Sequence, residues 1–79
     1  MAEYLVPTLA EAKRYWKTGG VKSKLTKEAQ RFFRMGQKWL TTKGGYPAVV
    51  SHDPDGQGSY IIAFRITAST GRIHAVQSP

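Results

Sequence analysis

Only a few side chains of this chain could carry out acid–base or metal chemistry. The sequence has 79 residues, with two histidines, five acidic residues and no cysteine. The lack of cysteine excludes disulfides, thiolate zinc sites and cysteine nucleophiles. Hydrolytic catalysis needs a base, an orienting group and an electrophilic stabiliser at close range. His52 and His74 fall in the first and third of three predicted strands, where the second strand would separate them. We therefore expect no catalytic site, no metal site and no cofactor.

The segment HDPDGQG, residues 52–58, begins like a calcium-binding loop. The twelfth position counted from Asp53 is Phe64, where an EF-hand requires a bidentate glutamate. No helix is expected on either side of the segment. Asp55-Gly56 between two strands is typical of a hairpin turn, which is how we interpret it.

The positive charge of the chain is concentrated in its first half. The formal net charge is +7, and residues 1–45 hold ten Lys/Arg against three acidic residues. In residues 46–79, Arg65 and Arg72 are balanced by Asp53 and Asp55. Such an asymmetry indicates a polyanionic partner, either a nucleic acid, an acidic protein surface or an anionic membrane.

The segment from Lys24 to Thr42 has the period of an amphipathic helix. Its apolar positions form one stripe at helical spacing: Leu25, Ala29, Phe32, Gly36 and Leu40. Four cations lie on the opposite side within roughly 60° of arc, with Lys24 just outside them. They are Lys27, Arg31, Arg34 and Lys38. The sequence therefore predicts a long helix with one buried face and one cationic face.

This cationic row contains like-charge pairs at i, i+4, which destabilise a helix by a few tenths of a kcal/mol each. Glu28 is the only acidic residue in the segment. A polyanionic partner would offset this repulsion. In the alternative interpretation, the row is a solvent-exposed helix face that is basic but binds no partner. Further candidates for anion binding lie near the end of an earlier predicted helix, namely Lys13, Arg14 and Lys17.

Two helices are expected to position these cations. Thr8 and Glu11 match a capping box, so the first helix should span Thr8–Thr18 and stop at Gly19-Gly20. Ser23 or Thr26 could cap the second helix, and Gly44-Gly45 should end it. Gly36 would then lie inside a helix, which predicts a close backbone approach there.

After Gly45 the period changes from helical to two. The predicted strands are Tyr46–His52, Ser59–Thr67 and Arg72–Gln77, and residues 3–7 could form a short arm or edge strand. Short connections imply an antiparallel meander. The expected fold is a single α+β domain over residues 1–79, in the order α-α-β-β-β, with two helices on one face of a three-stranded meander.

The leading functional hypothesis is a non-enzymatic nucleic-acid-binding protein that contacts phosphates through the cationic row. The alternative is a small adaptor or inhibitor that docks on an acidic protein surface, of the type that mobile elements encode. No run of 18 apolar residues is present, so we expect no membrane span. We also expect no membrane-surface binding, because the apolar stripe of the second predicted helix is needed for the core. The lack of cysteine fits a reducing cytoplasm, where we expect the protein.

A third hypothesis comes from a resemblance. The strand sequence GSYIIAFRI, Gly58–Ile66, is similar to the central strand of ribonuclease toxins of the RelE/ParE superfamily. That family also places helices before an antiparallel meander and uses basic, aromatic and histidine side chains on the sheet. The resemblance covers this strand and the order of elements. The strong first strand and the basic C-terminal segment of the family are not evident here.

Overall fold

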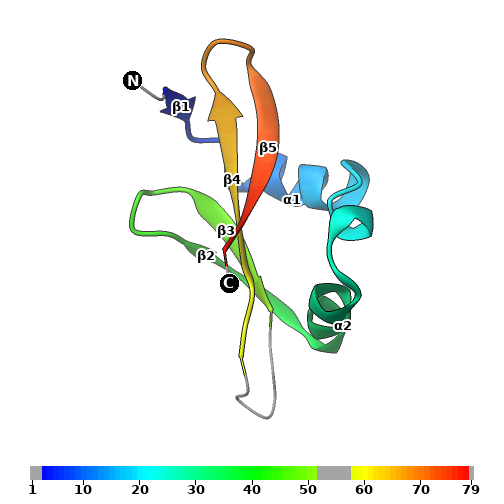
Figure 1. Ribbon diagram of the computed structural model, residues 1–79. Helices are drawn as coiled ribbons and strands as arrows, with labels where there is room; N and C mark the ends of the chain where they lie inside the picture. The colour runs from blue at the N-terminus through cyan, green and yellow to red at the C-terminus, as the bar shows by residue number, and fades with distance from the viewer. Residues whose placement is uncertain (1–2, 52–57, 79) are drawn as a thin grey trace.

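The computed structural model describes residues 3–51 and 58–78, and it consists of a sheet with helices on one side (Figure 1). The elements in chain order are β1 (Tyr4–Leu5), α1 (Leu9–Thr18), a 3₁₀ turn η1 (Lys22–Lys24), α2 (Lys27–Met35), β2 (Gln37–Thr41), β3 (Pro47–Ser51), β4 (Ile61–Thr67) and β5 (Arg72–Ser78). The α+β class expected from the sequence is confirmed.

The sheet has five antiparallel strands, so the prediction of a three-stranded meander was wrong. β2, β3, β4 and β5 form a four-stranded meander, in which β5 pairs along the whole of β4. β3 pairs with residues 61–63 of β4, and β1 pairs with residues 66 and 67. Because β5 occupies the other edge of β4, β1 and β3 must share one edge, end to end.

Helix α1 begins as the sequence predicts. The Thr8 hydroxyl accepts a hydrogen bond from the backbone N–H of Glu11 at 3.1 Å, and the Glu11 carboxylate accepts one from the backbone N–H of Thr8 at 2.9 Å. This capping box satisfies free donors at the helix start. The backbone and hydroxyl hydrogen bonds from Thr8 also lower the pKa of Glu11.

Helix α2 is shorter than predicted. It is capped by the Thr26 hydroxyl, which accepts from the backbone N–H of Ala29 at 3.1 Å, and it ends at Met35. Gly36 follows in extended backbone, with φ 165° and ψ 154°. The next five residues form β2 and pair one to one with β3. The prediction of a helix up to Thr42, with Gly36 packed in its interior, was therefore wrong.

An aromatic core lies between the helices and the sheet. The Trp16 ring lies 5.1 Å from Phe33 and 6.4 Å from Phe64 between centroids, and the Trp39 ring stacks on Phe64 at 5.5 Å. Nε1 of Trp16 donates a hydrogen bond to Oε1 of Gln37 at 2.8 Å. This bond ties α1 to the strand β2 that replaces the second half of the predicted helix.

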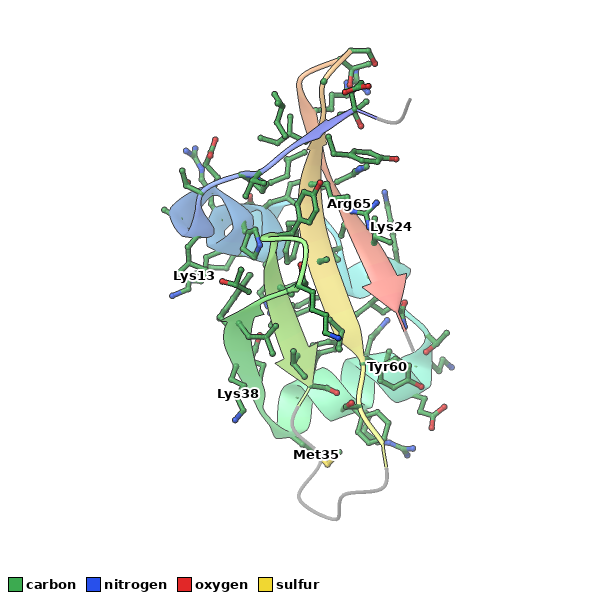
Figure 2. The ribbon with its side chains drawn as sticks, turned by 90° about the vertical axis from the view of Figure 1, so that its left-hand side faces the viewer. Lys13, Lys24, Met35, Lys38, Tyr60 and Arg65 are labelled. Atoms are coloured by element: carbon green, nitrogen blue, oxygen red, sulfur yellow. The ribbon has the colours of Figure 1, made fainter. Side chains whose placement is uncertain are left out.

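The sheet has a helix-covered face and an uncovered face. Both α1 and α2 contact β3, and both lie on the same side of the sheet (Figure 1). Phe64 is buried under the helices, so its neighbours along β4, Ala63 and Arg65, point to the other face. In the part of the chain that the structure describes, no helix covers that face, which Figure 2 views directly.

Candidate functional site

Three members of the predicted cationic row share the outer side of α2. Lys27, Arg31 and Arg34 are exposed, while Ala29 and Phe33 are buried on the opposite side of the helix. The helical spacing of these three cations places them within roughly 60° of arc. The short helix thus presents one face to the core and a cationic face to solvent.

The fourth predicted member, Lys38, is not part of this row. It lies in β2, paired with Val50, and is exposed. Its neighbour Trp39 faces the core, so Lys38 points to the uncovered face of the sheet. Its inclusion in a helical row was wrong because α2 ends three residues before it.

The remaining predicted cations lie on the other helical segments. Lys13, Arg14 and Lys17 are exposed on α1, and Lys24 is the last residue of η1 and is also exposed. In Figure 2, Lys13 lies on the side of β2 and Lys24 on the side of β5. These cations are therefore spread over the width of the helical layer rather than gathered in one spot.

One further cation belongs to this surface but was missed in the sequence. Lys22 of η1 is exposed and lines a cleft of about 110 Å³ together with Arg34, so η1 and α2 present cations at the same place. Its Nζ lies 5.0 Å from the centroid of the Trp16 ring, a cation–π contact. The signal in the sequence was its position in the basic connector between the two helices.

We call the exposed Lys and Arg residues of α1, η1 and α2 the cationic layer. Its members are Lys13, Arg14, Lys17, Lys22, Lys24, Lys27, Arg31 and Arg34. Residues 9–35 contain these eight cations and two carboxylates, so they carry +6 of the total charge of +7.

Both carboxylates of residues 9–35 have other partners. Glu11 is held in the capping box of α1. Glu28 lies close to Tyr60, whose pKa is raised by burial and then by the charge of Glu28 and its hydrogen bond. The field of the cationic layer is therefore neutralised only weakly from within.

A second group of polar and aromatic side chains lies on the uncovered face. The guanidinium carbon of Arg65 is 4.9 Å from the centroid of the Tyr4 ring and 5.4 Å from that of the Tyr46 ring. His74 is the cross-strand neighbour of Arg65, and its ring lies 5.7 Å from that of Tyr4. We call Tyr4, Tyr46, Arg65 and His74 the sheet-face cluster.

In the sheet-face cluster, Nε of Arg65 and Nε2 of His74 are buried and have no hydrogen-bond partner within residues 3–51 and 58–78. An acid–base histidine is normally oriented by a hydrogen bond to a second group. The described residues provide no such bond to Nε2 of His74.

The other chemical candidates of the sequence were the pair of histidines and the turn that resembles a calcium loop. His52 and the turn that resembles a calcium loop lie outside the described residues, 3–51 and 58–78. Strand β4 does separate β3 from β5, as expected. Over the described residues there is no group of three His, Cys, Asp or Glu that could hold a metal ion. None of the helices in that part of the chain has the length and apolar character needed to cross a membrane.

Comparisons with protein families, with curated proteins and with solved structures gave no match to this chain.

Proposed function

We propose that this protein binds nucleic acid, DNA or RNA, through contacts between the cationic layer and phosphates. The observation that carries the proposal is the charge of the helical segments, with eight exposed cations and two carboxylates that have other partners. Lys and Arg side chains that neutralise phosphates release condensed counterions, which supplies affinity without regard to base sequence.

The composition of the layer favours phosphate contact over base readout. Its exposed members on α2 are long, flexible cations, and Gln30 is half-buried and donates to the backbone oxygen of Leu25 at 2.9 Å. Amide side chains that read base edges must be free to form bidentate pairs. Phosphate contacts position a protein on the polymer but carry no sequence information directly.

A nucleic acid suits the layer better than an acidic protein surface does. The cations extend from the β2 side of the molecule to the β5 side (Figure 2). A nucleic-acid backbone presents regularly spaced charges over such a distance. An acidic protein, the second candidate, would have to present carboxylates over the same width.

We propose binding without catalysis. The cationic layer has no nucleophile or base in its composition, because its exposed functional groups are ammonium and guanidinium. His74, which would be the general base of a ribonuclease on the sheet, has no hydrogen-bonded partner at Nε2 among the described residues. A gel assay with labelled RNA should therefore show a shifted band of unchanged length.

The partner class is tested by affinity capture from a cell lysate with and without nuclease. Wild-type protein and the Arg31→Gln/Arg34→Gln double variant serve as baits, because both side chains are exposed and lie on the face of α2 opposite the core. We expect wild type to retain nucleic acid, and nuclease to release everything bound to it. A stoichiometric acidic protein that survives nuclease and is lost with the double variant would instead support the second candidate.

A further inference from the structure

The sheet-face cluster is arranged around one arginine. Arg65 lies in the middle of β4, the central strand of the sheet, on the uncovered face (Figure 2). Its guanidinium group is flanked by the rings of Tyr4 and Tyr46. Three planar groups, from β1, from β4 and from Tyr46 just before β3, are thus brought together although they are far apart in the sequence.

Within residues 3–51 and 58–78, the sheet-face cluster has hydrogen-bonding nitrogens that no other group satisfies. Nε of Arg65 and Nε2 of His74 are both buried and unpartnered. Leaving a buried polar atom without a partner is unfavourable, and such atoms in a folded protein require an explanation. The core does not supply one, because it lies on the other side of the sheet. A ligand cannot reach these two atoms directly, but Arg65 and His74 are only half-buried, so other parts of both side chains lie at the surface of the uncovered face.

The charge of the uncovered face indicates the chemistry of that ligand. Around the cluster it carries Lys38 of β2 and Arg72 of β5, which are exposed. The five strands, in the part of the chain that the structure describes, contain no aspartate or glutamate on this face. The face is therefore complementary to an anion.

The planar groups of the cluster indicate that the anionic ligand is a single-stranded nucleic acid. Unpaired bases stack on aromatic rings and on arginine guanidinium planes, whereas the base faces of a duplex are already stacked on one another. Tyr4 is 38% exposed, so its ring is open to such a base. An acidic peptide would also complement the positive charge, but it has no bases that would stack on the two tyrosine rings.

We infer that the uncovered face of the sheet is a platform for single-stranded nucleic acid, where bases stack on Tyr4 and Tyr46 and a phosphate binds Arg65. The inference rests on the proposed function for the class of ligand, and it adds base contacts on a second surface. The cationic layer contributes sequence-independent affinity for single and double strands alike. The sheet-face cluster contributes affinity for unpaired bases only.

The test compares three fluorescent probes of about 12 nucleotides: an oligothymidine strand, an abasic strand with the same phosphates, and a duplex. Fluorescence anisotropy with wild type should show tighter binding to oligothymidine than to the abasic strand. Tyr4→Leu should lower oligothymidine affinity about 5- to 150-fold, which is the range for the loss of one stacked base. Its affinities for the abasic strand and the duplex should stay unchanged.

Two matched controls accompany these measurements. Leu5→Ala perturbs β1 next to Tyr4 but faces the other side of the sheet, and it should bind like wild type. Arg65→Gln should weaken oligothymidine binding more than Lys43→Gln, which removes the same charge from an exposed turn. Circular dichroism establishes that each variant is folded, and because Tyr4 is partly exposed, Tyr4→Leu provides the test if Arg65→Gln does not fold.

Equal affinity of wild type for the oligothymidine and abasic strands would overturn the inference, as would an unchanged affinity of Tyr4→Leu. Neither result affects the proposed function, which fails separately if Arg31→Gln/Arg34→Gln binds all three probes like wild type. Tyr4→Leu could also lose the preference for oligothymidine while Arg31→Gln/Arg34→Gln binds like wild type. That result would support nucleic-acid binding by the sheet face and refute nucleic-acid binding by the cationic layer.

Discussion

Lys27 lies at a position where a cation is unfavourable to the helix that carries it. It is the first residue of α2, after the cap Thr26, and the positive end of the helix dipole is there. It is also four residues before Arg31, a like-charge pair on the same side of the helix. Lys27→Gln removes both effects and keeps the helix propensity nearly unchanged. We predict that this variant is more stable than wild type and binds nucleic acid more weakly.

The size of the effect follows from these two interactions. A charge in the first turn of a helix changes stability by about 0.3–1 kcal/mol. A like-charge pair at i, i+4 contributes about 0.2–0.5 kcal/mol. The sum is about 0.5–1.5 kcal/mol, which corresponds to a rise in Tm of roughly 2–12 °C for a domain of this size.

The assay is thermal unfolding followed by circular dichroism at low ionic strength, with Lys17→Gln as the matched control. Lys17 is exposed like Lys27, and Lys17→Gln also removes one charge. Lys17 lies in the last turn of α1, however, where a cation is favourable. Its removal also relieves repulsion from Lys13, so its net effect should be close to zero. Screening by about 1 M salt should reduce the gain in Lys27→Gln. A lower Tm for Lys27→Gln than for wild type would show that Lys27 stabilises the fold, and the argument would fail.

Three further predictions concern the fold and its pH dependence. Gln37→Met leaves Nε1 of Trp16 without its acceptor, which should cost about 1–3 kcal/mol in urea unfolding, and an unchanged midpoint would contradict the role of this bond. Thr8→Ala removes the cap of α1, which should cost about 1 kcal/mol in the same assay, and should raise the pKa of Glu11 in an NMR titration. Because the pKa of Tyr60 is raised in the folded state, its contribution to stability is present below the unfolded pKa of about 10 and is lost as the pH rises through the folded value. Glu28→Gln should lower the pKa of Tyr60 in an NMR titration. An unchanged pKa would show that Glu28 and Tyr60 do not interact.

The elements with strong local signals were predictable from the sequence. The capping box at Thr8 and Glu11 fixed the start of α1, and the alternation after Gly45 identified the three strands that became β3, β4 and β5. These signals depend on neighbouring residues only. The short strand at residues 3–7 was also considered, and it appears as β1 beside β4.

The end of α2 was not predictable from periodicity. Trp39 and Leu40 continue the helical spacing of apolar residues after Phe32, and the segment QKWLT has no apolar–polar alternation that would mark it as a strand. Pairing with β3 along five residues favours the strand, an interaction between segments that local propensity does not contain. Gly36 was the available signal, because glycine commonly ends a helix. The interpretation as a packing glycine missed it.

The sheet-face cluster was missed for a related reason. Period two in Ser59–Thr67 already separates Arg65 from Phe64, so Arg65 could be assigned to the face away from the core. Its contacts with Tyr4 and His74 depend on the registers of β1 and β5 against β4. Register is set by the whole sheet, and a shift of one residue would place Tyr4 on the other face.

The salt dependence of duplex binding tests the cationic layer most directly. Each phosphate contact contributes about 0.9 to the slope of log affinity against log salt, so loss of two contacts in Arg31→Gln/Arg34→Gln should lower the slope by about 1.8. Between about 50 and about 200 mM salt, wild type should then lose about 12-fold more affinity than this variant. Lys43→Gln removes one charge from outside both proposed surfaces, and its slope should equal that of wild type. A slope for Arg31→Gln/Arg34→Gln that equals the slopes of wild type and Lys43→Gln would contradict the account.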